Sequence, residues 1–504
     1  MSRPIRWASR SGWRMNIPPF NSSYEKIAQL SILKIAIIEF NLLKTKYLKA
    51  AVQQSMNKEE EGMHLLIKNG LVVTMNKARE LIKTNILIKG DRILALGDDF
   101  KGIPVDQSIN AEGMLVIPGL IQGHIHLCQA LFRGLADDLE LLDWLKQRIW
   151  PLEAAHDQET LYYSALLGCA ELIRGGTTGI IDMGTVQHSD SLFQAVKKAG
   201  IRYLGGKCLM DQGENLPPGL SENTDKAIKE SLDLIKRWDQ AEKGRLRYAL
   251  CPRFAVSCSP ELLDQVRDLS KTLNLSVHTH ASENQGEVEL VRRLTGLPNI
   301  TYFNEKGLCN EGLIVAHCIH LSDEEINLLV ESGSHIVHCP SANLKLASGF
   351  APIPRFLERG ANVSLGADGA PCNNNLSAFV EMRLASLIHK PAYGPRVMPA
   401  PQVFEMATLG GARAMGLESE TGSLEPGKKA DLALVKLEAW HHYPLDAASA
   451  YGHLVYQASA SDVYATIVDG RILMMGNRFL TLDANELRCG IGRSLQTVRQ
   501  RTGI

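Results

Sequence analysis

The sequence predicts an α/β protein, a (β/α)8 barrel that carries a small composite β-sandwich built from the segments on either side of it. Strand-like and helical segments alternate through the middle of the chain. Histidines and one aspartate end several of the strand-like runs, and functional side chains in such barrels lie at the carboxyl ends of the strands. Two β-rich segments flank the alternating part and share a short sequence.

Eight apolar runs are expected to form the barrel strands. Helical stretches such as Glu159–Arg174 and Glu261–Leu273 separate them. Eight strand–helix units over about 300 residues favour a closed barrel over an open sheet. The expected strands are 119–126, 178–183, 202–209, 246–252, 275–281, 313–318, 334–338 and 363–368.

The two flanking segments are rich in short strands joined by Asn-Gly and Gly-Asp turns. Gly90-Asp-Arg-Ile-Leu94 in the first nearly repeats as Asp469-Gly-Arg-Ile-Leu473 in the second. Similar segments around a different pattern predict one sheet domain built from both. The expected division is 63–117 and 421–485 for the β-sandwich, 118–420 for the barrel and 486–504 for a C-terminal tail.

The first 62 residues differ from the rest of the chain. Four arginines (Arg3, Arg6, Arg10 and Arg14) precede the first acidic residue, Glu25, which superficially suggests a transit peptide. We interpret residues 1–62 instead as a dispensable or misassigned extension and expect the functional chain to begin at Met63, where a clear strand starts.

Composition limits the partners. The 504 residues are 45% apolar and 22% charged with a net charge of −1, so no basic surface for nucleic acid or acidic lipid is expected. The ten cysteines include no Cys-x-x-Cys pair, and a chain of this length needs no disulfides, so we expect reduced thiols and a cytoplasmic protein. No apolar run approaches the ~18 residues of a membrane span.

A metal site is predicted at the strand ends. His124 and His126 lie two apart at the end of the first expected strand, so both side chains face the same side and can bind one ion. His280 and Asp368 end later strands, and barrel geometry brings these ends together. His278 faces the same way as His280, and we favour His280 as the ligand because Glu283 follows it by one tight turn.

The remaining histidines near strand ends receive other roles. His278 is expected to be a core residue or to support a ligand. His320, His335 and His338 are also expected to be structural or supporting, with a reservation for His338 because it lies near a strand end.

These residue types suit water activation. A carboxylate such as Asp368 can ligate a metal and accept a proton from bound water, whose pKa the metal lowers towards neutrality. Glu283 can carry the proton to a leaving group, and His317 can polarise or orient the attacked centre. Three imidazoles and a carboxylate suit zinc, iron or manganese.

The chain resembles the amidohydrolase superfamily, in its deaminase and chlorohydrolase branch, over residues 63–480. The segments that carry the resemblance are Pro118–His126, His280–Glu283, Ala316–Cys318, His338–Leu346 and Gly366–Asn375. The resemblance implies that His124, His126, His280 and Asp368 hold one divalent metal, zinc or iron before manganese, and that Glu283 and His317 are catalytic. Members with two metals carry a lysine on the fourth strand, and Leu246–Arg253 has none.

Within the branch, the residues expected to bind the substrate resemble those of two different subfamilies. The segments Asp143–Glu153 and Asp368–Asn375 resemble methylthioadenosine/S-adenosylhomocysteine deaminases, in which the glutamate matching Glu153 binds ribose hydroxyls. Arg253, Phe254 and Gln129 resemble the base-binding residues of guanine deaminases. Lys207 and Arg253 stand where adenosine-type enzymes would have arginine and histidine, which puts S-adenosylhomocysteine in doubt as a substrate.

The combination resembles 5′-deoxyadenosine deaminases most, which implies hydrolysis of an aminopurine nucleoside to its inosine form and ammonia by a homo-oligomer. Guanine deaminase, a triazine-type amino- or chlorohydrolase and a non-catalytic metal-binding scaffold stay open as alternatives. Structural roles also stay open for Phe254 in the core, for Arg253 in a strand-end ion pair and for Trp144, which is expected to pack.

Overall fold

The computed structural model describes residues 63–504 apart from 99, 101 and 214–215, so the predicted extension 1–62 lies outside the described residues. Each predicted barrel run contains strand residues, in two cases as two short strands. The barrel strands are β6 (Leu120–His126), β7 (Thr177–Thr185), β8 (Arg202–Leu209), β9 (Leu246–Tyr248) with β10 (Cys251–Pro252), β11 (Val277–Ala281), β12 (Leu313–His317), β13 (His335–His338), and β14 (Val363–Leu365) with β15 (Asp368–Gly369).

The strands close into a barrel. Neighbouring strands pair in parallel from β6 to β9 and from β11 to β14. A parallel bridge between Leu250 and Val277 joins the two sets on one side. On the other side β15 pairs with β6, with Asp368 opposite Ile125. The predicted (β/α)8 barrel is therefore confirmed.

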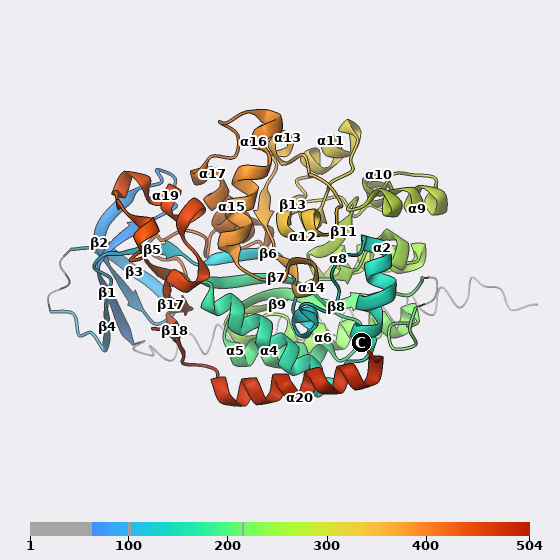
Figure 1. Cartoon of the computed structure of the whole chain (residues 1–504), viewed down its shortest axis with the longest axis horizontal. Coiled ribbons are helices and arrows are strands. Elements are labelled where there is room, and N and C mark those ends of the chain that lie inside the picture. Colours follow the sequence, from blue (N-terminus) through green and yellow to red (C-terminus); the bar gives the residue numbers. More distant parts are fainter. Residues whose placement is uncertain (1–62, 99, 101, 214–215) are drawn as a thin grey trace, which may run out of the picture. The chain divides into compact units, whose positions relative to one another are not determined.

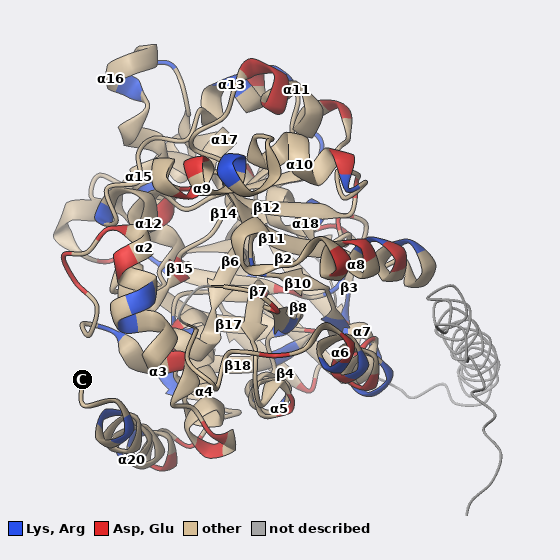
Figure 2. Ribbon diagram, turned by 90° about the vertical axis from the view of Figure 1, so that its right-hand side faces the viewer, with Lys and Arg blue, Asp and Glu red and all other residues tan. Residues whose placement is uncertain are grey.

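Helices surround the strands. In α8 (Pro260–Leu273), Ser259 caps the first turn by accepting from the Leu262 amide, and Asn274 ends the helix in a left-handed conformation. Figure 2 shows most charged residues on such helices and loops and few on the barrel strands. The other helices are α2 (Leu141–Trp144), α3 (Trp150–Ala154), α4 (Gln158–Arg174), α5 (Ser189–Ala199), α6 (Thr224–Trp238), α7 (Ala241–Gly244), α9 (Gln285–Thr295), α10 (Asn299–Glu305), α11 (Asp323–Glu331), α12 (Pro340–Lys345), α13 (Ile353–Glu358), α14 (Ala370–Asn373), α15 (Ala378–Ile388), α16 (Lys390–Tyr393), α17 (Ala400–Glu405), α18 (Gly411–Ala414), α19 (Ala450–Gly452) and α20 (Ala484–Thr502).

The flanking segments form one nine-stranded sheet, as the composite domain predicts. Leu434 of the second segment pairs with Val116 of the first, so the two halves share hydrogen bonds as well as an apolar core. Figure 1 shows the two sets of strands side by side at one end of the barrel. The strands are β1 (His64–Val73), β2 (Leu81–Lys89), β3 (Arg92–Gly97), β4 (Gln107–Asn110), β5 (Met114–Pro118), β16 (Leu432–Lys436), β17 (Val463–Val468), β18 (Arg471–Met475) and β19 (Arg478–Phe479).

The expected C-terminal tail is a helix. Asp483 caps α20 by accepting from the amides of Asn485 and Glu486, and α20 lies along α4 (Figure 1). A Cβ added to Gly490 would approach the ring of Tyr163 to 2.1 Å, so glycine permits the close contact between these two helices. Within the described residues no helix is long and apolar enough to cross a membrane.

A buried ion-pair cluster joins the barrel to the sheet. Arg202 on β8 is 3% exposed and donates to Asp431 at 2.6 and 3.0 Å and to Asp469 at 2.5 Å. Replacing Arg202 with methionine would leave two acids beside an uncharged side chain, and we expect it to lower the free energy of unfolding by about 3–5 kcal/mol. Denaturant unfolding of both proteins measures this difference.

The matched control is Arg493→Met, which removes the pair between Arg493 and Glu159, in which both side chains are 61% exposed. We expect this change to leave the free energy of unfolding close to that of the wild type, because solvent screens an exposed pair. Equal losses of stability in the two variants would contradict the role assigned to the buried cluster.

Candidate metal centre and active-site pocket

The four predicted metal ligands meet where β6 and β11 end and where β15, the short strand that follows β14, begins with Asp368. The Nε2 atoms of His126 and His280 lie 3.1 Å apart. Oδ1 of Asp368 lies 3.3 Å from Nε2 of His124 and 3.4 Å from Nε2 of His126. Three imidazole nitrogens and a carboxylate oxygen thus converge on one small volume, as strand-end geometry predicts.

Hydrogen bonds fix which ring nitrogens face this volume. Nδ1 of His280 lies 2.6 Å from the carbonyl oxygen of Arg253. Because a carbonyl only accepts, Nδ1 carries the proton and Nε2 keeps its lone pair, as a metal ligand requires. Nε2 of His124 is buried and has no hydrogen-bond partner among the described residues. The site therefore fits a divalent metal ion.

His278 lies next to His124, where its ring can support the ring of His124. Its Nε2 is 2.8 Å from Nδ1 of His124, and its side chain is fully buried. An acceptor at this position holds the proton of His124 on Nδ1 and leaves Nε2 free for a metal.

We expect His278→Leu to weaken zinc binding by about 10- to 100-fold, because the ring of His124 loses the acceptor that orients it. Competition with a chelating dye measures the affinity. His442→Leu, which removes another fully buried imidazole that does not line the pocket, is the control and should bind zinc like the wild type. Unchanged affinity in His278→Leu would contradict the orienting role.

Glu283 and His317 lie beside the predicted ligands. Nε2 of His317 is 3.5 Å from Oε2 of Glu283 and 3.8 Å from Oδ2 of Asp368. Nδ1 of His317 lies 2.8 Å from Oδ1 of Asn343, which fixes the ring. A ligand atom of His317 also lies within 4.8 Å of those of His124 and Asp368, so His317 could contact the same ion.

Three residues around the site have a left-handed backbone. Ser282 has a φ of 55°, His317 of 74° and Asp368 of 63°. L-residues disfavour this conformation, and such strain is typical of active sites and ligand clamps. Ser282 directly follows β11 and precedes Glu283, His317 ends β12, and Asp368 begins β15, so the strained backbone lies next to the groups that face the site.

The surroundings of Glu283 and Asp368 shift the pKa values of these two carboxyl groups in opposite directions. Burial raises the pKa of Glu283 to about 7, so it can both hold and release a proton near neutral pH. Burial alone would also raise the pKa of Asp368, but the facing imidazoles of His124, His126 and His317 hold it well below its usual range. One acid can therefore exchange protons while the other stays ionised.

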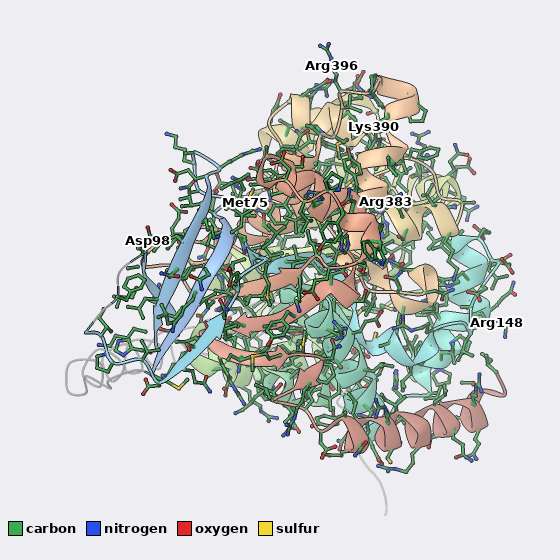
Figure 3. All side chains as sticks on the ribbon, turned by 60° about the vertical axis from the view of Figure 1, so that its left-hand side comes forward. Met75, Asp98, Arg148, Arg383, Lys390 and Arg396 are labelled. Carbon is green, nitrogen blue, oxygen red and sulfur yellow. The ribbon has the colours of Figure 1, made fainter. Side chains whose placement is uncertain are left out.

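A pocket with about 450 Å³ of empty space, part of it open to solvent, adjoins these groups. All predicted site residues line it except His124 and Glu153, which lie behind its wall. Leu141 and Trp144 of α2 contribute an apolar side, so Trp144 also lines the pocket. In Figure 3 Arg148, which lies close to Trp144 in the chain, is on the opposite side of the molecule from Met75 and Asp98, which lie in the connections after β1 and β3.

The predicted substrate residues form one buried network. Glu153 accepts from Arg253 at 2.6 and 3.2 Å and from Nε2 of Gln129 at 2.8 Å. Because Nε2 of Gln129 is used in this way, its Oε1 is left as an acceptor, and this buried atom has no partner among the described residues. Phe254 is 6% exposed and lines the pocket beside Arg253.

Sequence reasoning missed two polar residues of the site. Asn343 lies in the segment His338–Leu346, but nothing in its spacing shows that it meets His317. Glu287 lines the pocket and lies four residues after Glu283, a helical spacing that could have drawn attention to it.

The chain is similar to known amidohydrolases and deaminases. Residues 115–473 match the model of the amidohydrolase family. A 5-methylthioadenosine/S-adenosylhomocysteine deaminase of Moorella thermoacetica is 40% identical over 428 residues, which cover 84% of this chain and 97% of that protein. A 5′-deoxyadenosine deaminase of Methanosarcina mazei is 39% identical over 426 residues, covering 84% and 95%.

The fold has solved counterparts. An adenosine deaminase of Xanthomonas campestris, whose crystal structure contains zinc, is 30% identical with a TM-score of 0.81. The match covers 87% of this chain and 99% of that one.

Proposed function

The chain belongs to the amidohydrolase family, and from this premise we propose that it is a metal-dependent hydrolytic deaminase of adenosine derivatives, with 5′-deoxyadenosine as its preferred substrate. Water replaces the amino group at purine C6, giving an inosine-type product and ammonia. The observation that carries the proposal is the placement of Glu283 and His317 beside the converging imidazoles of one pocket. The relatives named as deaminases of adenosine derivatives support the substrate class.

His124, His126, His280 and Asp368 would hold one divalent ion, with zinc or iron ahead of manganese. A bound ion would supply a Lewis acid that makes a nucleophile of water near neutral pH. The zinc in the Xanthomonas campestris adenosine deaminase supports this metal. The absence of lysine from Leu246–Arg253 supports a single ion.

Glu283 would move the proton. Its buried carboxyl, with a pKa of about 7, can take a proton from the attacking water and deliver it to N1 of the ring, which prepares the amino group to leave. His317 would orient the reacting carbon. Burial lowers the pKa of His317, but Glu283 and Asp368 outweigh it and raise the pKa, so a protonated Nε2 can donate to oxygen at C6.

The apolar side of the pocket would hold the purine and exclude water. Phe254 and Trp144 offer aromatic surface, and Oε1 of Gln129 offers a hydrogen-bond acceptor to the base. Arg253 would contact the base or sugar. For Glu153 to bind ribose hydroxyls, as the resemblance implies, it must share its carboxylate with Arg253 and Gln129.

Guanine is the second candidate substrate. The lining of the pocket by Gln129, Arg253 and Phe254, which match the base-binding residues of guanine deaminases, favours it. A free base would leave Glu153 in its pair with Arg253 undisturbed.

A panel of 5′-deoxyadenosine, adenosine, methylthioadenosine, guanine and melamine tests the proposal, with ammonia release, purine absorbance and metal content measured on the same sample. We expect the highest kcat/KM with 5′-deoxyadenosine and about one metal ion per chain. Ammonia from guanine alone would overturn the nucleoside assignment, and no ammonia from any of the five would favour a metal-binding scaffold without catalysis.

A further inference from the structure

A second buried carboxylate, Glu287, lines the pocket beside Glu283. It lies in the first turn of α9, is 2% exposed and accepts from the backbone amide of Glu283 at 3.0 Å. Its other oxygen accepts from Nδ2 of Asn299 on α10. Among the described residues no lysine or arginine forms an ion pair with Glu287. Its hydrogen bonds therefore link the segment that carries Glu283 to α10 rather than balance a positive charge.

The turn that Glu287 holds carries the proposed proton carrier. Ser282, directly before Glu283, has a left-handed φ of 55°, and α9 begins two residues after Glu283. Glu283 lies between β11 and α9, so its amide belongs to neither hydrogen-bond ladder, and a buried amide needs another acceptor. Glu287 supplies that acceptor and also connects the turn to α10 through Asn299.

We propose that Glu287 is a positioning residue that keeps the carboxyl group of Glu283 directed at His317 by holding the Glu283 amide. The proposal rests on the proposed deaminase function. Without this hydrogen bond the turn at Ser282 can relax, and the carboxyl of Glu283 leaves its place 3.5 Å from Nε2 of His317.

Asn299 makes two substitutions of Glu287 distinguishable. Oδ1 of Asn299 is buried and has no partner among the described residues. In Glu287→Gln the amide of Asn299 can turn over and accept from the new NH2 group, so that Oε1 of the glutamine still accepts from the Glu283 amide. In Glu287→Met the volume is kept but the acceptor is lost.

The chain offers a matched control on α11. Glu325 is 3% exposed and accepts from the amides of Ser322 and Ile300 at 3.0 Å each. Like Glu287, it is a buried glutamate that accepts hydrogen bonds from backbone amides, here at the starts of α11 and α10. It does not line the pocket. Glu325→Met therefore reports what losing such an acceptor does to the protein as a whole.

We expect Glu287→Met to lower kcat by about 10- to 100-fold with KM and metal content unchanged, the size of effect that a misplaced catalytic group produces. Glu287→Gln should retain most of the wild-type kcat, and Glu325→Met should retain it even where its Tm falls. Equal losses of kcat in both Glu287 variants would show that the negative charge of Glu287 matters rather than its hydrogen bond with the Glu283 amide. No loss in either would show a packing role. Either outcome overturns the proposal.

Hydrogen exchange of the Glu283 amide gives a readout that needs no substrate. It should be faster in Glu287→Met than in the wild type, and unchanged in Glu287→Gln and Glu325→Met. If the wild-type protein deaminates nothing, the proposed function fails while this comparison still decides the role of Glu287. Unchanged exchange in Glu287→Met would overturn the positioning role even in an active enzyme.

Discussion

Replacing Glu283 with glutamine is expected to lower kcat by about 10²- to 10⁴-fold with one metal ion still bound. Glutamine keeps the shape of the side chain and its place beside His317, but it can neither take a proton from water nor give one to the purine ring. The raised pKa of Glu283, about 7 because the group is buried, is what makes the carboxyl useful in both steps near neutral pH. Steady-state kinetics with the preferred nucleoside and metal analysis of the same sample measure the effect.

Glu325→Gln is the control, since it makes the same chemical change in a buried glutamate that does not line the pocket. Its kcat should match the wild type. If Glu283→Gln kept near-normal turnover, the proton would have to move by another group. If it lost activity only in proportion to lost metal, Glu283 would be supporting the metal site instead.

The sequence predicted the barrel well because each strand run ends in a turn and is separated from the next by a helix. The strand β6 ends at His126 as expected, and β12 ends at His317, one residue before the expected end. The helix α20 was missed as a helix. Gly490 and Gly492 lower its intrinsic helix propensity, and the packing of Gly490 against Tyr163 depends on a partner more than 300 residues away in the chain.

The site could be predicted to the extent that strand geometry determines it. His124 and His126 share a face by the two-residue period of a strand, and closure of the barrel brings Asp368 to them. An ion pair at the strand end stayed open for Arg253, but its partner could not be predicted, because Glu153 on α3 and Arg253 are 100 residues apart in the chain. Resemblance placed these residues near the substrate but did not show that they bind one another.

Replacing Asp368 with asparagine is expected to weaken metal binding by more than about 100-fold, beyond the effect of changing a supporting residue, and to abolish turnover with it. Asp368 supplies the negative charge that faces His124, His126 and His317. Its backbone has a φ of 63°, and asparagine is one of the few residues that tolerate this conformation. The substitution thus removes the charge and leaves the backbone of the β15 strand end as it is.

Asp138→Asn is the matched control, because Asp138 also has a left-handed φ, of 61°, but is exposed and does not line the pocket. Metal content after dialysis against a chelator, together with kcat on zinc replacement, separates the possibilities. An Asp138→Asn protein should keep its metal and its activity. An Asp368→Asn protein that retained a full metal ion would show that the imidazoles alone hold it. In that case the carboxylate would serve proton transfer rather than metal binding. If added zinc restored turnover to the Asp368→Asn protein, a role in proton transfer would be contradicted.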